Sequence, residues 1–171
     1  SPNGVTWTQR TLPTTANWQS VTYGNGVFVA VAVGGTIAAT SPNGVTWTQR
    51  TLPTTANWYS VTYGNGVFVA VAVGGTVAAT SPDGITWTQR ALPISAAWIS
   101  VTYGGTSFVA VASGGTVAAT SPDGITWTQR ALPISAAWIS VTYGGTSFVA
   151  VASGGTVAAT SPDGITWTQR A

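Results

Sequence analysis

The amino-acid sequence repeats with a period of 40 residues. Residues 1–40 return almost unchanged at 41–80, and residues 81–120 recur without a change at 121–160. The stretch 161–171 opens a fifth copy. A fixed period of this length indicates an array of one supersecondary unit, which buries its apolar face only against its neighbours. Because two of the units are identical, neither can hold an active site that the other lacks.

The composition narrows the possible functions. Hydrophobic residues make up 44% of the chain, which is enough for a core, whereas charged residues make up only 5%, against about 25% in ordinary globular chains. The net charge of +2 comes from five arginines and three aspartates. The chain has no Lys, Glu, His or Cys. One Arg per repeat is a poor electrostatic footprint for nucleic acid. No apolar run approaches the ~18 residues of a spanning helix, so no membrane partner is expected.

One repeat, taken from residue 17 to residue 50, predicts four β-strands in an antiparallel meander. The strands are expected at 18–23, 27–33, 36–40 and 45–50, where β-branched and aromatic residues concentrate. Asn25-Gly26 stands between two apolar runs and predicts a tight hairpin, because a type I′ turn needs positive φ at both central residues. Gly34-Gly35 and the SPNG sequence at 41–44 predict the other two turns. In the fourth strand, Val45, Trp47 and Gln49 are expected to share one face.

Radial packing of such sheets gives a β-propeller, in which only short, protected strand edges remain. The predicted fold class is therefore all-β, a propeller of 40-residue four-stranded antiparallel blades with four blades per chain. A β-solenoid is the alternative, and the three hairpin-type turns per repeat argue against it. Residues 1–171 form a single repeat domain. Its blades are expected at 17–50, 57–90, 97–130 and 137–170, with 1–11 as a spare outer strand.

The turn between the third and fourth strands carries a recurring motif. It reads SPDGITW at 81–87, 121–127 and 161–167, and SPNGVTW at 1–7 and 41–47. The motif resembles the Asp-box of sialidase-like (BNR) propellers, with one residue fewer between Asp and Gly. The whole repeat is similar to the short-blade propeller repeats of phage tail proteins and of photosystem-assembly-factor-like bacterial proteins. Near-identity of the copies indicates recent amplification or engineering.

The resemblance implies that this turn is structural and lies on the outer rim. A short side-chain oxygen can accept hydrogen bonds from backbone N–H groups two residues on, and Asn can do this as well as Asp. The tryptophan three residues after the glycine is expected to pack beneath the turn. The turn residues are Asn3, Asn43, Asp83, Asp123 and Asp163, together with Trp47, Trp87 and Trp127. One carboxylate per turn is too few for calcium, so neither a metal nor another cofactor is expected.

The inventory of catalytic groups is nearly empty. Paired carboxylates require that two turns of different blades meet, and no base is present to activate a serine or threonine. The sialidase arrangement needs an arginine cluster, a tyrosine nucleophile and an acid, whereas the arginines here occupy one position per repeat. The chain is therefore expected not to be an enzyme.

Binding between blades is the remaining kind of site. A candidate sugar site between blades would combine polar loops, an arginine and a nearby aromatic ring. The simpler interpretation is that the aromatic rings pack in the core and the arginines are merely exposed to solvent. The candidate binding residues are Arg50, Asn57, Tyr59, Arg90 and Arg130.

An open arc of four blades leaves apolar faces at both ends, which association of copies buries. The expected partner is a second copy, giving eight blades with two-fold symmetry; a closed four-bladed ring or a longer array are alternatives. The spare strand 1–11 competes with 161–171 for one edge position. The predicted function is a non-enzymatic scaffold that closes its ring by homo-oligomerisation. The alternative is a multivalent lectin-like module with one weak glycan site per blade. The sequence assigns no compartment.

Overall fold

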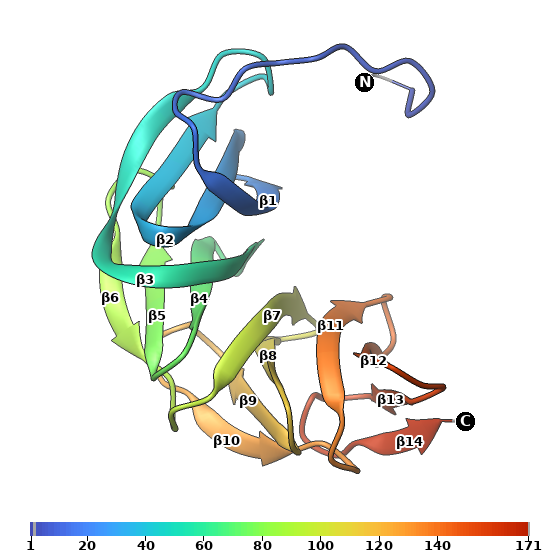
Figure 1. The fold of residues 1–171 in the computed structure, drawn as a ribbon. Helices are drawn as coiled ribbons and strands as arrows, with labels where there is room; N and C mark the ends of the chain where they lie inside the picture. Colours follow the sequence, from blue (N-terminus) through green and yellow to red (C-terminus); the bar gives the residue numbers. More distant parts are fainter. Residues whose placement is uncertain (2, 171) are drawn as a thin grey trace.

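The computed structural model describes residue 1 and residues 3–170, and its regular structure is entirely antiparallel β-sheet (Figure 1). In chain order the strands are β1 (Asn17–Gly24), β2 (Val27–Ser41), β3 (Thr48–Gly64), β4 (Val67–Val73), β5 (Val77–Ser81), β6 (Thr88–Ala91), β7 (Ala97–Gly104), β8 (Ser107–Ser113), β9 (Val117–Ser121), β10 (Thr128–Ala131), β11 (Ala137–Tyr143), β12 (Phe148–Ser153), β13 (Ala158–Ser161) and β14 (Thr168–Arg170). In this part of the chain no helix is long and apolar enough to cross a membrane.

The third blade shows the unit most plainly. β7 pairs with β8, β8 with β9 and β9 with β10, each time antiparallel and to its chain neighbour. The fourth blade repeats this order as β11 to β14. The structure confirms the prediction of an all-β chain built from four-stranded antiparallel blades.

The first two blades are joined by longer strands. β2 runs through the predicted turn at Gly34 and Gly35, where φ values of 83° and 131° bend the chain without ending the strand. β3 continues from the outer strand of the first blade into the inner strand of the second. The hairpin prediction at 25–26 is confirmed, because Asn25 and Gly26 both have positive φ, 48° and 76°.

The fourth strand of the repeat begins later than the alternation predicted. In the first blade it starts at Thr48 instead of Val45, because residues 43–47 stay in the turn. The expected shared face is therefore wrong. Val45 is 44% exposed and Trp47 is half-buried.

The blades follow one another along an open arc (Figure 1). The strands β1, β7, β11 and the second half of β3 lie toward the inside of the arc, and β6 and β10 lie on its outer rim. The two chain ends lie on either side of the opening, and the segment before β1 extends away from the first blade. Within residues 3–170 the core forms three apolar clusters, one between each pair of successive blades.

Candidate functional site

The SPDG turn is held by its own side chains. In the second blade, Asp83 Oδ1 accepts hydrogen bonds from the backbone N–H groups of Ile85 at 2.8 Å and Thr86 at 2.9 Å. The Ser81 hydroxyl donates to the same oxygen at 3.0 Å and accepts the N–H of Gly84 at 2.8 Å. The turn thus satisfies three backbone donors without any partner from outside it.

The same turn fastens its blade to the preceding one. Trp87 donates its ring N–H to the Gly84 carbonyl at 3.1 Å and is 9% exposed. Gly84 has a φ of +75°, and a Cβ there would lie 2.6 Å from a methyl carbon of Val29 in the first blade. Glycine is therefore required at this position by both its backbone angle and its neighbour.

Asn43 makes the same two bonds as an aspartate, accepting from Val45 at 2.9 Å and from Thr46 at 3.0 Å. An amide oxygen therefore serves this turn as well as a carboxylate oxygen. In the second blade, the N–H of Thr86 chiefly holds the pKa of Asp83 below its usual value, and Ile85 and Ser81 act in the same direction against partial desolvation. The pKa values of Asp123 and Asp163 are lowered for the same reasons.

Replacing Asp83, Asp123 and Asp163 together by Asn should cost less than about 1 kcal/mol per site at neutral pH, because the acceptor oxygen survives. Replacement by Ala should cost more. Each aspartate has its pKa lowered by folding, so its stabilising effect is present above the unfolded pKa of about 3.9 and is lost as pH falls through the lower folded value. The Asn variant should therefore lose less stability below about pH 4 than the parent chain.

Thermal melting of the three proteins between acid and neutral pH measures both effects, and added EDTA serves as a control. Equal acid sensitivity of the Asn variant and the parent would contradict the role given to the carboxylates. A large drop in melting temperature with EDTA would reveal a bound metal. Among the residues that the structure describes, no three His, Cys, Asp or Glu side chains gather as a metal site.

The arginines proposed for binding make local contacts within their own blades. Each donates its Nε–H to the hydroxyl of a threonine on the neighbouring third strand, at 2.9–3.0 Å. The pairs are Arg50 with Thr40, Arg90 with Thr80 and Arg130 with Thr120. All three arginines are half-buried. This geometry ties the outer strand to its neighbour and leaves only part of each guanidinium for a ligand.

The structure does not gather the other candidate binding residues around the arginines. Arg50 pairs with Ala38 of β2 and Asn57 with Val33, and the register of the two strands shifts between these pairs. Asn57 is exposed, whereas Tyr59 is half-buried where the pairing of β3 with β4 is irregular between Trp58 and Ser60. A glycan site that uses all three side chains of one blade stays a prediction.

Each pair of successive blades is joined by the same set of buried contacts. At the first junction, Val29 and Val31 of the first blade pack against Trp58 and Phe68 of the second, and all four are fully buried. The second and third junctions repeat the same contacts with the residues 40 and 80 positions further on. Each junction therefore has an inserting side of valines and a receiving side of aromatic residues.

A hydrogen bond joins the inner strands at every junction. A serine hydroxyl accepts the backbone N–H of a valine in the next blade at 3.1 Å. The pairs are Ser20 with Val61, Ser60 with Val101 and Ser100 with Val141. This contact fixes how one blade is placed along the next.

A tyrosine ring also lies directly on a glycine of the preceding blade. Tyr63 covers Gly24, and a Cβ at this glycine would overlap the ring. The other two pairs are Tyr103 on Gly64 and Tyr143 on Gly104. These glycines do not have positive φ, so close approach of the ring is what requires them.

The first blade leaves its receiving side uncovered. Val21 is 60% exposed, whereas its equivalents Val61, Val101 and Val141 are each 5% exposed. Tyr23 is 57% exposed. We call this surface the leading face; it comprises Trp18, Val21, Tyr23, Phe28 and Trp47.

The fourth blade leaves its inserting side uncovered. Val149 and Val151 are 37% and 41% exposed, although Val69 and Val71 at the same positions of the second blade are fully buried. An added Cβ at Gly144 meets nothing within 4 Å, because no tyrosine lies on it. We call this surface the trailing face; it comprises Ser140, Gly144, Val149 and Val151.

The two faces are the two halves of one junction. The leading face carries the valine and tyrosine that form the receiving side of an inner junction. The trailing face carries the serine, glycine and valines that form its inserting side. The repeat pattern predicts apolar ends of the arc but not the residues that form them. Knowing which blade face meets which neighbour would have identified them.

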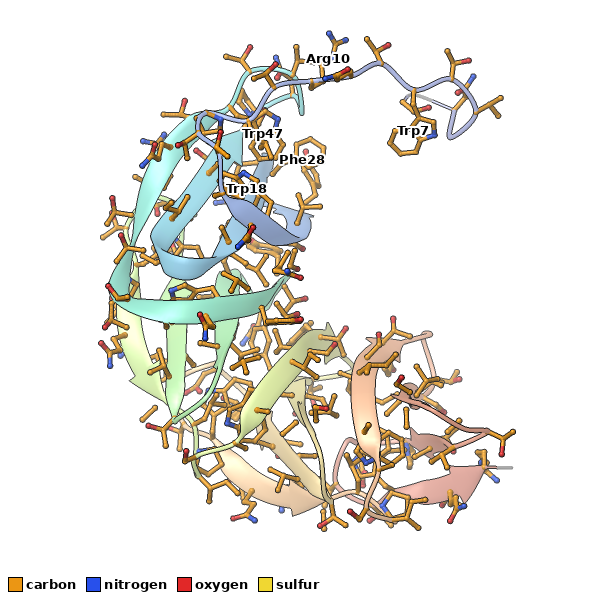
Figure 2. All side chains as sticks on the ribbon, in the orientation of Figure 1. Trp7, Arg10, Trp18, Phe28 and Trp47 are labelled. Carbon is orange, nitrogen blue, oxygen red and sulfur yellow. The ribbon has the colours of Figure 1, made fainter. Side chains whose placement is uncertain are left out.

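The terminal segment before β1 stands off from the leading face. A hollow of about 460 Å³ separates them and is lined by Trp7 and Arg10 of the segment and by Trp18 and Trp47 of the blade, among others. Figure 2 shows Trp7 across open space from Phe28 and Trp47. Trp7 is 77% exposed, so the segment does not cover the face.

Solved structures with this architecture are β-propellers, and that is the class of fold to which the chain conforms. It is similar over 94% of its length to virginiamycin B lyase from Staphylococcus aureus, with 15% sequence identity and a TM-score of 0.84. It is also similar over 96% of its length to YCF48 from Cyanidioschyzon merolae, with 19% sequence identity and a TM-score of 0.73. It spans only 58% and 59% of those chains. It also matches the computationally designed Ika4 over 92% of its own length and 100% of that chain, with 14% identity and 0.66. No family model and no curated protein sequence matches it.

Proposed function

We propose that this chain is a non-enzymatic scaffold whose copies join head to tail, leading face to trailing face, and close a ring of eight blades from two copies. The observation that carries the proposal is the match between the two faces. Each presents one half of a contact that the molecule already makes three times internally. The partner is therefore a second copy of this chain.

The curvature of the arc supports a ring larger than four blades. Its first and fourth blades do not meet (Figure 1). Closing four blades on themselves would require a tighter turn at every junction, and the packed junctions resist such bending.

The chemistry of the described residues supports a role without catalysis. The three aspartates stand in equivalent turns of different blades, and each carboxylate is already engaged by its own turn. The similarity to virginiamycin B lyase, at 15% identity, concerns the fold alone.

The lectin-like alternative has weaker support. The arginine of each blade is held by a threonine, so only part of its guanidinium is left for a glycan. Glycan titration against the assembled ring tests this alternative, which requires binding with a stoichiometry near one per blade.

Native mass spectrometry of the 171-residue chain at micromolar concentration should show two copies per particle. The expected mass is therefore twice 17.3 kDa. Monomer alone would overturn the proposal and favour a ring closed within one copy. Larger or open-ended particles would show head-to-tail contact without closure at two copies.

A further inference from the structure

The terminal segment keeps the turn that precedes the outer strand in the blades, although it belongs to no blade. Asn3 Oδ1 accepts the N–H groups of Val5 at 3.0 Å and Thr6 at 3.1 Å, and Trp7 donates to the Gly4 carbonyl at 3.1 Å. The same bonds to the Asx oxygen and the glycine carbonyl occur in the turns inside the blades. The turn is therefore already formed before any sheet lies beside it.

The connection that follows is also in its blade conformation. Trp18 donates its ring N–H to the Thr14 carbonyl at 3.3 Å, just as Trp58 donates to Thr54 at 3.3 Å. At the inner junctions this connection links the outer strand of one blade to the inner strand of the next. By this equivalence, residues 8–10 correspond to the place of the outer strand of a preceding blade.

A second copy docked on the leading face would put its fourth blade in that place. The fourth blade already has an outer strand, β14, whose three residues are all exposed and pair with Ala158, Ala159 and Thr160 of β13. Residues 8–10 and 168–170 both read Thr-Gln-Arg. Two equivalent strands therefore compete for one edge at each junction between copies.

We propose that residues 8–10 of one copy take this edge, pairing with β13 of the other copy and displacing its β14. The inference rests on the proposed assembly. The exchange makes the chain continuous across the contact between copies, as β3 is across the first inner junction. It also brings Leu12 to the position of Leu52, which is 1% exposed, whereas Leu12 is now half-buried.

The exchange also changes the burial of two tryptophan side chains. Trp7 is 77% exposed in the single copy, and Trp167 beside β14 is 8% exposed. Exchange would bury Trp7 and expose Trp167, so their two contributions to the buried apolar area roughly cancel. The burial of Leu12 and the continuous connection to β1 then favour the terminal segment.

Cysteine pairs test the exchange directly, because the chain has no cysteine of its own. Thr160 pairs with Thr168 in β14, so exchange would place Thr8 of another copy opposite Thr160. Directly opposed residues in antiparallel strands have Cα atoms about 4.5–5.5 Å apart, which is within reach of a disulfide. The variant T8C/T160C should therefore form disulfides between copies and run as a dimer on non-reducing denaturing gels.

Two matched variants make the result specific. T160C/T168C should crosslink within one chain if β14 stays in place, and exchange should make this product the minor one in assembled rings. Q9C/T160C is offset by one residue, so its side chains point to opposite faces and should not crosslink efficiently. Adding Gln169→Pro to T8C/T160C should raise the yield between copies, because proline removes a ladder donor from β14.

The outcomes separate this inference from the assembly on which it rests. Native mass in reducing buffer reports assembly without any crosslink. If that mass is two copies while T8C/T160C stays uncrosslinked and T160C/T168C crosslinks within the chain, the exchange is wrong and the head-to-tail contact stands. If the mass is one copy, the assembly itself is wrong.

Discussion

Replacing Gly144 by alanine should abolish the two-copy ring and leave the single copy folded. In one copy, a Cβ at Gly144 meets nothing within 4 Å, and the residue does not have positive φ. In the proposed contact, Tyr23 of the second copy would lie on this glycine, as Tyr143 lies on Gly104. The added methyl group would overlap that ring, and overpacking of this kind costs about 1–3 kcal/mol or more at each of the two contacts.

Native mass spectrometry together with the melting temperature of the isolated copy measures this result. Gly104→Ala is the comparison inside the chain, and it should destabilise the fold itself because Tyr143 is fixed there by the same polypeptide. Thr88→Ala, on the exposed outer strand β6, is the neutral control. A Gly144→Ala protein that still forms rings would contradict the proposed contact.

Two charge variants should each form monomers alone but join when mixed. Val21→Asp places a charge on the leading face, and Val151→Asp places one on the trailing face. An unpaired charge buried in such a contact costs several kcal/mol, which is enough to lower affinity by orders of magnitude. Mixed one to one, each variant still offers one intact face, so they should form a particle of two copies with a single contact.

The mixing result distinguishes head-to-tail contact from contact between like faces. If leading faces met each other, Val151→Asp alone would still dimerise. Both substitutions lie on surfaces that are partly exposed in the single copy, so the fold should change little. Thr88→Asp, on the exposed outer strand β6, is the control and should leave the ring intact.

Much of the fold could be predicted because the information is local and repeated. Asn25-Gly26 specifies its hairpin through backbone angles that few other residues adopt, and the structure has those angles. The alternation of Val45, Trp47 and Gln49 misled the strand prediction. The side chain of Asn43 holds the N–H groups of Val45 and Thr46, which keeps those residues out of the ladder.

The candidate interface could not be predicted by residue, because it depends on position in the array. Val21 and Val61 stand in nearly the same sequence context, yet one is 60% and the other 5% exposed. Only the presence or absence of a neighbouring blade distinguishes them. The candidate glycan residues show a second limit. Nothing in the sequence indicated that Thr40 would accept the Nε–H of Arg50 and so occupy part of its guanidinium.

Because every blade carries both halves of the junction, the contact does not depend on where one polypeptide stops and another starts. Arrays with three or five repeats would present the same leading and trailing faces as this chain and could join it. The number of blades in a ring would then be set by the angle between successive blades and not by the chemistry of the faces. A gain or loss of whole repeats would leave the surface for recognition between copies intact, so chains of different length would remain compatible parts of one assembly.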